Sequence, residues 1–177
     1  MFPAEVVISS GELALLLRLA ALRNRSNLDS GVRDAKWASY SGEELNQTGI
    51  LAERAVATLL DVPMDLSLEP RSGGHDLDLP GVSVEVKATR HPRGRLMQPL
   101  SVDVEAEVIV FCTVPGPPYP PSGLLVTVHG WTRTMDLRVP ERLATVESGK
   151  LPRGVTRANF LMRQDELETR PIPEGTR

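Results

Sequence analysis

Apolar positions in the first third of the chain repeat with a helical period. In the segment Ser9-Ser10-Gly11-Glu12, Glu12 stands three residues after Ser9, as in a capping box, and a run rich in Leu and Ala follows to about Arg23. This run is apolar on most sides, so we expect the helix to pack against the domain's own sheet or a second subunit. The polar residues 24–42 predict a loop or broken helix, and a second helix is predicted from about Gly42 to Leu60.

The second predicted helix has one apolar face. At steps of about 100° per residue, six apolar side chains share one arc: Leu45, Leu51, Ala52, Ala55, Val56 and Leu59. Glu53 falls just outside this arc, beside Leu60. We therefore expect its carboxylate at the margin between the helix and the core.

The period changes to that of β-strands after the turn Ser72-Gly73-Gly74. The runs His75–Leu79 and Val82–Thr89, joined by Pro80-Gly81, predict a hairpin, and the apolar run Glu107–Val114 predicts a central strand buried on both faces. Elsewhere the pattern predicts a basic loop at 90–95, a Pro-rich loop at 115–123, a strand at 124–129, an irregular or partly helical segment at 136–157, an edge strand at 159–162 and a loose tail from 169.

Composition narrows the class of protein. The 177 residues are 41% hydrophobic and 24% charged, which suits one globular domain or one domain with appendages. The lone Cys112 excludes an internal disulfide, fits a reducing cytoplasm, and leaves no Cys/His cluster with zinc spacing. The apolar stretch Leu13–Leu22 is too short to span a bilayer and contains Arg18, so we expect no membrane segment. The net charge of −3 means that any nucleic-acid surface must be a local basic patch.

The predicted hairpin has one polar face. Ser83, Glu85, Lys87 and Thr89 share one side of the second run, and Asp76 and Asp78 share the same side of the first. If Pro80-Gly81 forms a two-residue loop, paired residue numbers sum to 161, and Asp76 stands opposite Glu85. Pro-Gly favours a type II turn, which is not the preferred hairpin turn, so a longer loop would shift this pairing.

This pairing favours a site for a divalent cation. Cross-strand Cβ atoms lie about 5 Å apart, and two carboxylates at that separation suit a cation such as Mg²⁺, which takes oxygen ligands at roughly 2.1 Å. Lys87 lies on the same face, where its ammonium can reach a water or phosphate oxygen beside the cation. Asp78 is the alternative ligand, and the register favours Asp76.

Asp76 followed by Glu85-Val86-Lys87 on a strand after a turn resembles the PD-(D/E)XK motif of restriction-endonuclease-like nucleases. The segment Gly49–Ala57 resembles the helix with a glutamate that usually opens this family's core. The resemblance covers about Gly49 to Val114. The segment Phe160–Ile172 shows a weaker resemblance to the C-terminal ends of some phage-encoded and uncharacterised bacterial members of this family. His75 stands where the family name has a proline.

The resemblance implies an α/β fold with a restriction-endonuclease-like core, a mixed sheet of four or five strands flanked by helices. We expect an N-terminal helical extension at 1–41, a nuclease core at 42–168 and a flexible tail at 169–177. The implied activity is hydrolysis of DNA phosphodiester bonds that depends on Mg²⁺ or Mn²⁺.

The resemblance also assigns roles to residues. Asp76 and Glu85 would ligate the metal together with the Val86 carbonyl. Lys87 would orient or help to deprotonate the attacking water. Glu53 would act from the helix, through a water on the metal or through a second metal.

A basic loop follows the motif. Lys87, Arg90, Arg93 and Arg95 fall within nine residues that contain no acid. We expect the three arginines to contact DNA phosphates, and Gln98 to hydrogen-bond the DNA backbone or a base edge. A plain solvated loop is the competing interpretation.

Other functions fit the same residues. An exposed sheet face shows the same polar alternation as the predicted site. The main alternative is a catalytically inactive DNA-binding or assembly protein on the same fold. Another is a small structural or interaction protein that oligomerises through the N-terminal helix, which is also our reason to expect a homodimer. The form of DNA, its sequence and the choice between endo- and exonuclease action stay open.

Overall fold

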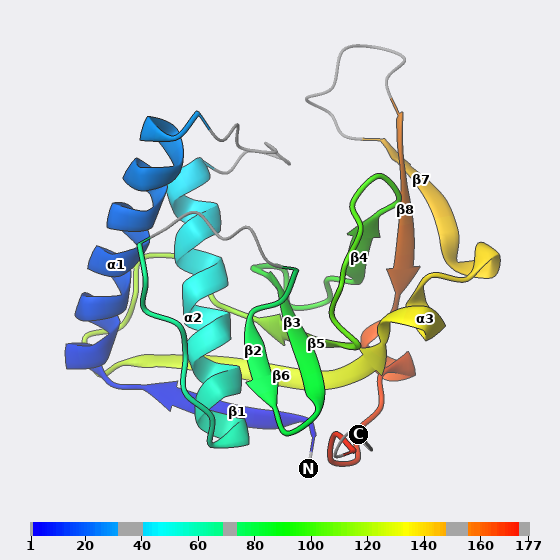
Figure 1. Cartoon of the computed structure of the whole chain (residues 1–177). Helices are drawn as coiled ribbons and strands as arrows, with labels where there is room; N and C mark the ends of the chain where they lie inside the picture. Colours follow the sequence, from blue (N-terminus) through cyan, green and yellow to red (C-terminus); the bar gives the residue numbers. More distant parts are fainter. Residues whose placement is uncertain (1, 32–40, 69–73, 148–155, 174–177) are drawn as a thin grey trace.

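The computed structural model describes residues 2–31, 41–68, 74–147 and 156–173, and every structural statement below concerns these residues (Figure 1). Parts of the predicted loop at 24–42, the turn at 72–74, the segment at 136–157 and the end of the tail lie outside them. The elements in chain order are β1 (Ala4–Ile8), α1 (Ser10–Asp29), α2 (Gly42–Leu60), β2 (Leu77–Leu79), β3 (Val82–Thr89), β4 (Leu96–Pro99), β5 (Val108–Thr113), β6 (Leu124–Arg133), α3 (Thr134–Leu137), η1 (Pro140–Arg142), β7 (Leu143–Glu147), β8 (Thr156–Met162) and η2 (Gln164–Glu166).

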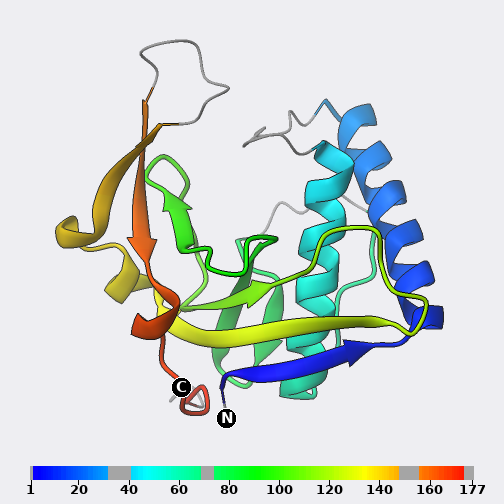
Figure 2. The ribbon, with the colours of Figure 1, turned by 180° about the vertical axis from the view of Figure 1, so that it is seen from behind.

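A mixed five-stranded sheet forms the centre of the molecule, with strand order β1-β6-β5-β3-β2. Strands β3 and β5 are parallel, and the other pairs are antiparallel. Helices α1 and α2 lie side by side at one end of the molecule, and the strands β4, β7 and β8 stand at the other (Figures 1 and 2). The expectation of an α/β fold with a mixed sheet of four or five strands is confirmed, and the sheet has five.

Local capping defines the two long helices. Ser9 caps α1, its hydroxyl accepting from the Glu12 amide, and a capping box of Ser41 and Glu44 starts α2. Helix α2 has the predicted bounds, but α1 continues six residues beyond Arg23. The polar extension is held by its neighbour, since Asn46 of α2 donates to the Asn24 side chain at 3.1 Å. No helix among the described residues is long and apolar enough to cross a membrane.

Strand β5 is buried along its whole length, as predicted, because it contributes to two cores. Its residues Val108, Val110 and Cys112 join the larger core, which contains the apolar faces of α1 and α2 and the β3 residues Val82, Val84 and Val86. Ile109 and Phe111 point to the other side of the sheet. There they meet a second, smaller core made by Leu96, Leu137, Phe160, Met162 and Leu167.

The second core is covered by a separate antiparallel sheet with strand order β4-β8-β7, which the sequence pattern did not predict. The segment at 136–157 was expected to be irregular or partly helical, but its described part includes β7. The prediction of an edge strand at 159–162 was wrong in position, because β8 is the central strand of this sheet. Each of the strands β4 and β7 has five residues or fewer, too few for a clear alternation.

The two ends of the described chain are built into the fold. Strand β1, inside the expected N-terminal extension, pairs with β6 along its full length. The expectation of a loose tail from 169 was wrong for residues 169–173. The Phe2 amide donates to the Thr169 carbonyl at 2.9 Å, the Trp131 indole donates to the Arg170 carbonyl at 2.8 Å, and Ile172 packs on the larger core.

Replacing Phe111 with alanine tests the role of the second core. The ring is fully buried between the two sheets, so Phe111→Ala is expected to lower the free energy of unfolding by about 3–5 kcal/mol in urea titrations. Leu28→Ala is the control, because this leucine is 59% exposed on α1 and its loss should change the value by less than about 0.5 kcal/mol. Equal effects of the two substitutions would contradict the two-core arrangement.

Candidate active site

The β2–β3 hairpin has the predicted register. Leu77 pairs with Val84, Asp78 with Ser83 and Leu79 with Val82, which leaves Pro80 and Gly81 as a two-residue loop. Gly81 has a φ of 74°, the left-handed conformation that the third residue of a type II turn requires. The Pro-Gly turn therefore does not shift the pairing.

Asp76 lies one residue before β2 and continues the contact with β3. Its amide donates to the Val84 carbonyl at 2.9 Å, and its Oδ2 accepts from the Val86 amide at 2.8 Å. The carboxylate thus takes a position on the β3 backbone where a longer β2 would have placed a carbonyl. Asp78 is different: its side chain is 83% exposed and contacts His75 Nε2 at 2.9 Å. Of the two aspartates, Asp76 is the one fixed against the Glu85-Val86-Lys87 segment.

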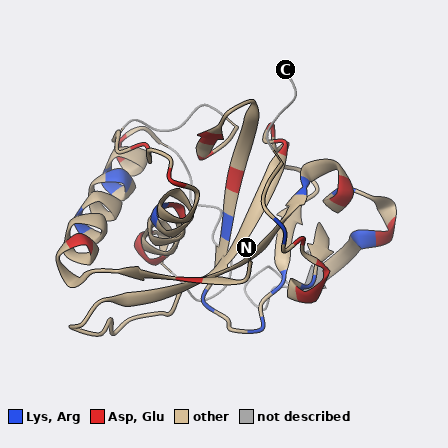
Figure 3. Cartoon of the chain, turned by 90° about the horizontal axis from the view of Figure 1, so that it is seen from below, with Lys and Arg blue, Asp and Glu red and all other residues tan. Residues whose placement is uncertain are grey.

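Glu85 and Lys87 project from one face of β3. The valines of β3 that pack under α2 project from the opposite face. Lys87 Nζ forms an ion pair with Glu85 Oε1, and the two side chains are 31% and 15% exposed. Figure 3 shows the adjacent basic and acidic bands on β3 and further basic bands on the loop that follows it. On the neighbouring β5, Ile109 and Phe111 are in register with Glu85 and Lys87, so the pair borders the second core.

A further carboxylate lies near the start of the hairpin. A Cβ added to Gly74 would meet the Glu105 Cβ at 2.5 Å, so the Glu105 side chain packs directly on the Gly74 backbone. The sequence pattern did not single out Glu105, and the only signal for this close approach is the glycine itself. Among the described residues, no group of three or more His, Cys, Asp and Glu side chains is arranged to hold a metal ion.

Glu53, the fourth acid expected from the sequence, is held by an arginine of α1. Glu53 Oε2 lies 3.3 Å from Arg23 Nη1 of α1, and both side chains are nearly buried, at 12% and 13% exposure. Arg23 also donates to the carbonyls of Asp65 and Ser67, at 2.6 and 3.0 Å. Through Arg23, Glu53 connects α2 to α1 and to the chain that follows α2.

Arg90 is bonded to the protein and is only 8% exposed. Its guanidinium donates to Thr48 Oγ1, Glu44 Oε1 and the Glu44 carbonyl, at 2.8, 2.9 and 2.8 Å. Hydrogen bonds from Ser41 and then Arg90 keep the pKa of Glu44 below its ordinary value, so the pair stays charged. Arg90 links the end of β3 to α2, which leaves it little surface for DNA.

The other expected DNA contacts divide into two kinds. Arg93 and Arg95 are exposed on a loop that Gln164 holds, donating to the carbonyls of Pro92 and Gly94 at 2.9 and 3.0 Å. Gln98 is fully buried and donates to the Val102 carbonyl at 3.1 Å. A contact of Gln98 with DNA is not compatible with this position, because its side chain belongs to the inner face of β4.

A histidine that sequence reasoning left unassigned lies on the same sheet face as Lys87. His129 Nε2 and Thr113 Oγ1 share a hydrogen bond of 2.6 Å, and the imidazole stacks at 5.8 Å from the Phe111 ring. The β5–β6 register shifts beside His129, which is the extra residue of a β-bulge. Partial burial lowers the pKa of this imidazole, and so favours its neutral form.

The donor set fits a hard divalent cation by its chemistry. Asp76, Glu85 and the Val86 carbonyl supply oxygen atoms only, and Mg²⁺ sites commonly use one or two carboxylates and complete the shell with water and substrate phosphate. Asp76 Oδ2 accepts from the Val86 amide, and Glu85 Oε1 pairs with Lys87.

Comparison of the chain with protein-family models, with curated proteins and with solved structures finds no match.

Arg90→Ala is expected to destabilise the fold, because it removes a nearly buried cation and three hydrogen bonds between β3 and α2. We expect the Tm to fall by roughly 5 °C in thermal melts followed by circular dichroism. Arg93→Ala on the exposed part of the loop is the matched control and should leave the Tm unchanged. A wild-type Tm for Arg90→Ala would show that this link contributes nothing to stability.

The lowered pKa of His129 predicts that the free energy of unfolding falls in mild acid. Its pKa is lower in the folded protein than in the unfolded chain, so between these values the unfolded chain binds more protons. Folding is not opposed by His129 above the pKa of this residue in the unfolded chain, near 6.5. The free energy of unfolding then decreases as the pH falls toward the lower pKa of His129 in the folded protein. Urea titrations at several pH values should show a steeper fall below about pH 6.5 for wild type than for His129→Gln. Parallel profiles would exclude this role.

Proposed function

We propose that the protein is a metal-dependent nuclease that hydrolyses DNA phosphodiester bonds, built on a restriction-endonuclease-like core. The observation that carries the proposal is the 2.8 Å hydrogen bond between the Asp76 carboxylate and the Val86 amide. It fixes one acid of the motif to the peptide that lies between the other two charged residues, Glu85 and Lys87. These three side chains come from a hairpin whose register agrees with the motif.

The proposed chemistry divides between the three side chains. Asp76, Glu85 and the Val86 carbonyl would hold Mg²⁺ or Mn²⁺, which supplies polarisation of the phosphoryl oxygen and acidifies water. Lys87 orients the attacking water with its ammonium and stabilises negative charge on the phosphate. The ion pair with Glu85 already holds the Lys87 ammonium beside a carboxylate of the proposed metal site. Arg93 and Arg95, on the loop that leaves β3, add charge for the DNA backbone.

A second candidate is a DNA-binding or assembly protein of the same fold without catalysis. It is favoured by the ion pairs that neutralise three of the expected catalytic groups, Glu53 with Arg23 and Glu85 with Lys87. We further propose a cytoplasmic location, consistent with the buried free thiol of Cys112. The homodimer also stays a proposal, supported by Leu15 and Leu22, exposed seven residues apart on α1.

Cleavage of labelled DNA tests the proposed activity. Supercoiled plasmid, linear duplex, single-stranded and branched DNA would be incubated with Mg²⁺, Mn²⁺ or EDTA. We expect cleavage that EDTA abolishes and that Lys87→Ala or Glu85→Gln reduces by about 10²-fold or more. Arg18→Ala, an exposed change on α1, should cleave like wild type.

Two other outcomes have clear meanings. Equal cleavage by wild type and Lys87→Ala would remove Lys87 from the proposed chemistry. Absence of cleavage of every DNA form, combined with metal-independent DNA binding, would favour the second candidate.

A further inference from the structure

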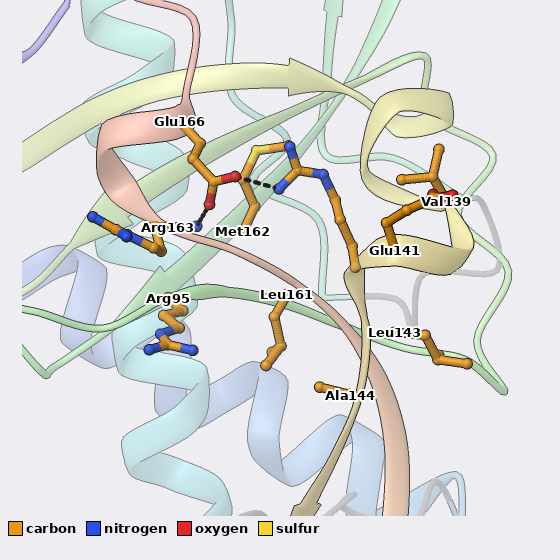
Figure 4. Close-up of a pocket in the computed structure, with 10 residues that line it drawn as sticks. Arg95, Val139, Glu141, Leu143, Ala144, Leu161, Met162, Arg163 and Glu166 are labelled. Atoms are coloured by element: carbon orange, nitrogen blue, oxygen red, sulfur yellow. Dashed lines mark hydrogen bonds and ion pairs between the residues drawn. The ribbon is translucent and has the colours of Figure 1, made fainter.

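A pocket opens on the β4-β8-β7 sheet, outside the proposed catalytic residues. Its volume is about 590 Å³, within the range of small-ligand sites. Arginines and apolar side chains from β7, β8 and the adjoining turns line it, together with Arg95 from the loop before β4 (Figure 4). The lining includes three arginines and two glutamates, so positive charge is in excess.

Two of the arginines form a cationic end. Leu96 pairs with Met162 at the end of the β4–β8 ladder, and both residues point into the second core. Arg95 and Arg163 follow this last pair, just outside the ladder, and Figure 4 shows them at the same end of the pocket. Two cations at one end of a pocket repel each other, and an anion between them relieves that repulsion. Asp165 binds Arg163 in an exposed pair, whereas Arg95 forms no ion pair or side-chain hydrogen bond among the described residues.

The third arginine is held in place by its neighbours. Arg142 donates to Glu166 Oε1 at 2.9 Å and to the Asp136 carbonyl at 3.1 Å. Glu166 in turn accepts from the Arg163 amide at 2.8 Å. This amide and then the Arg142 side chain lower the pKa of Glu166, so it stays ionised and fixes the wall of the pocket.

The remainder of the pocket is lined by apolar side chains, with a glutamate at the end away from Arg95. Leu161 and Ala144 lie in its middle, with Leu143 beyond them, and Glu141 lies across the pocket from Arg95 (Figure 4). A ligand that matches this order has an anionic head, a flat body with apolar faces and an N–H donor at its far end. A nucleotide whose base carries an exocyclic amine has all three parts.

We propose that this pocket binds a 5′-phosphorylated nucleotide. Arg95 and Arg163 contact the phosphate, the aliphatic side chains support the sugar and base, and Glu141 accepts from the exocyclic amine. The choice of a nucleotide rests on the proposed function, because a DNA-cleaving enzyme meets this chemistry at a strand end. Arg95 belongs to the loop that leaves the strand of Glu85 and Lys87, so the pocket and the catalytic residues would act on one substrate.

Calorimetric titration of the full chain with dAMP and with dTMP, in EDTA, tests the pocket. We expect dAMP to bind more tightly, since thymine has no exocyclic amine. Arg95→Gln should weaken binding of both nucleotides by about tenfold or more through loss of charge-assisted hydrogen bonds. Glu141→Gln should reduce only the preference for dAMP. Arg18→Gln, on α1, is the control and should bind like wild type.

A short oligodeoxyadenylate with a 5′-phosphate or a 5′-hydroxyl separates the two sources of the nucleotide. Tighter binding of the phosphorylated strand than of dAMP assigns the pocket to a strand end, and equal binding assigns it to a free nucleotide. Equal affinities of wild type and Arg95→Gln, or no binding of dAMP and the phosphorylated strand, would overturn the proposal.

The EDTA titrations keep this inference separate from the proposed activity. Arg95-dependent nucleotide binding in a protein that cleaves no DNA with Mg²⁺ would reject the nuclease and retain the pocket. Metal-dependent cleavage in a protein without that binding would do the reverse.

Discussion

Burial of β5 on both faces is the constraint on which the rest of the structure depends. A strand with apolar residues on both sides requires cover on both sides, since either face left in water would lose about 25 cal/mol for each Å² exposed. Helices α1 and α2 cover one face, and the β4-β8-β7 sheet with α3 covers the other. The second sheet is therefore a consequence of Ile109 and Phe111, and with it come the loop of Arg93 and Arg95 and the pocket.

The position of β3 beside β5 explains where polar chemistry is tolerated. β3 is parallel to β5 and lies one strand from the edge of the sheet, so only one of its faces is fully covered. Val84 and Val86 use that face, and Glu85 and Lys87 take the other, at the border of the second core. The short β2 leaves part of the β3 backbone unpaired by strand, and Asp76 supplies the missing acceptor for Val86. One hairpin of limited length thus gathers three charged residues.

Local pattern was sufficient to predict α2, the hairpin with its register and the buried β5, because each depends on periodicity or turn chemistry within a short stretch. In the second sheet, β4 pairs with β8 across more than fifty residues of sequence, and the short outer strands β4 and β7 have no strong period. Strand β1 was missed for a similar reason. A helical projection placed Glu53 at the margin of the core correctly, but it could not show that Arg23 of another helix supplies its counter-charge.

The basic loop shows why residue type alone does not define a binding surface. Arg90, Arg93 and Arg95 are equivalent in the sequence, yet each has a different environment. Arg90 turns back to Glu44 and Thr48 at the end of β3, because a buried guanidinium needs acceptors and α2 provides a carboxylate, a hydroxyl and a carbonyl. Gln164 of η2 holds the carbonyls of Pro92 and Gly94, on either side of Arg93, and the side chains of Arg93 and Arg95 are exposed to solvent. Arg90 therefore joins the helix to the sheet, and only Arg93 and Arg95 offer positive charge to a ligand. Because the same loop connects β3 to β4, the stability of that junction and the placement of Arg95 at the pocket depend on one short segment.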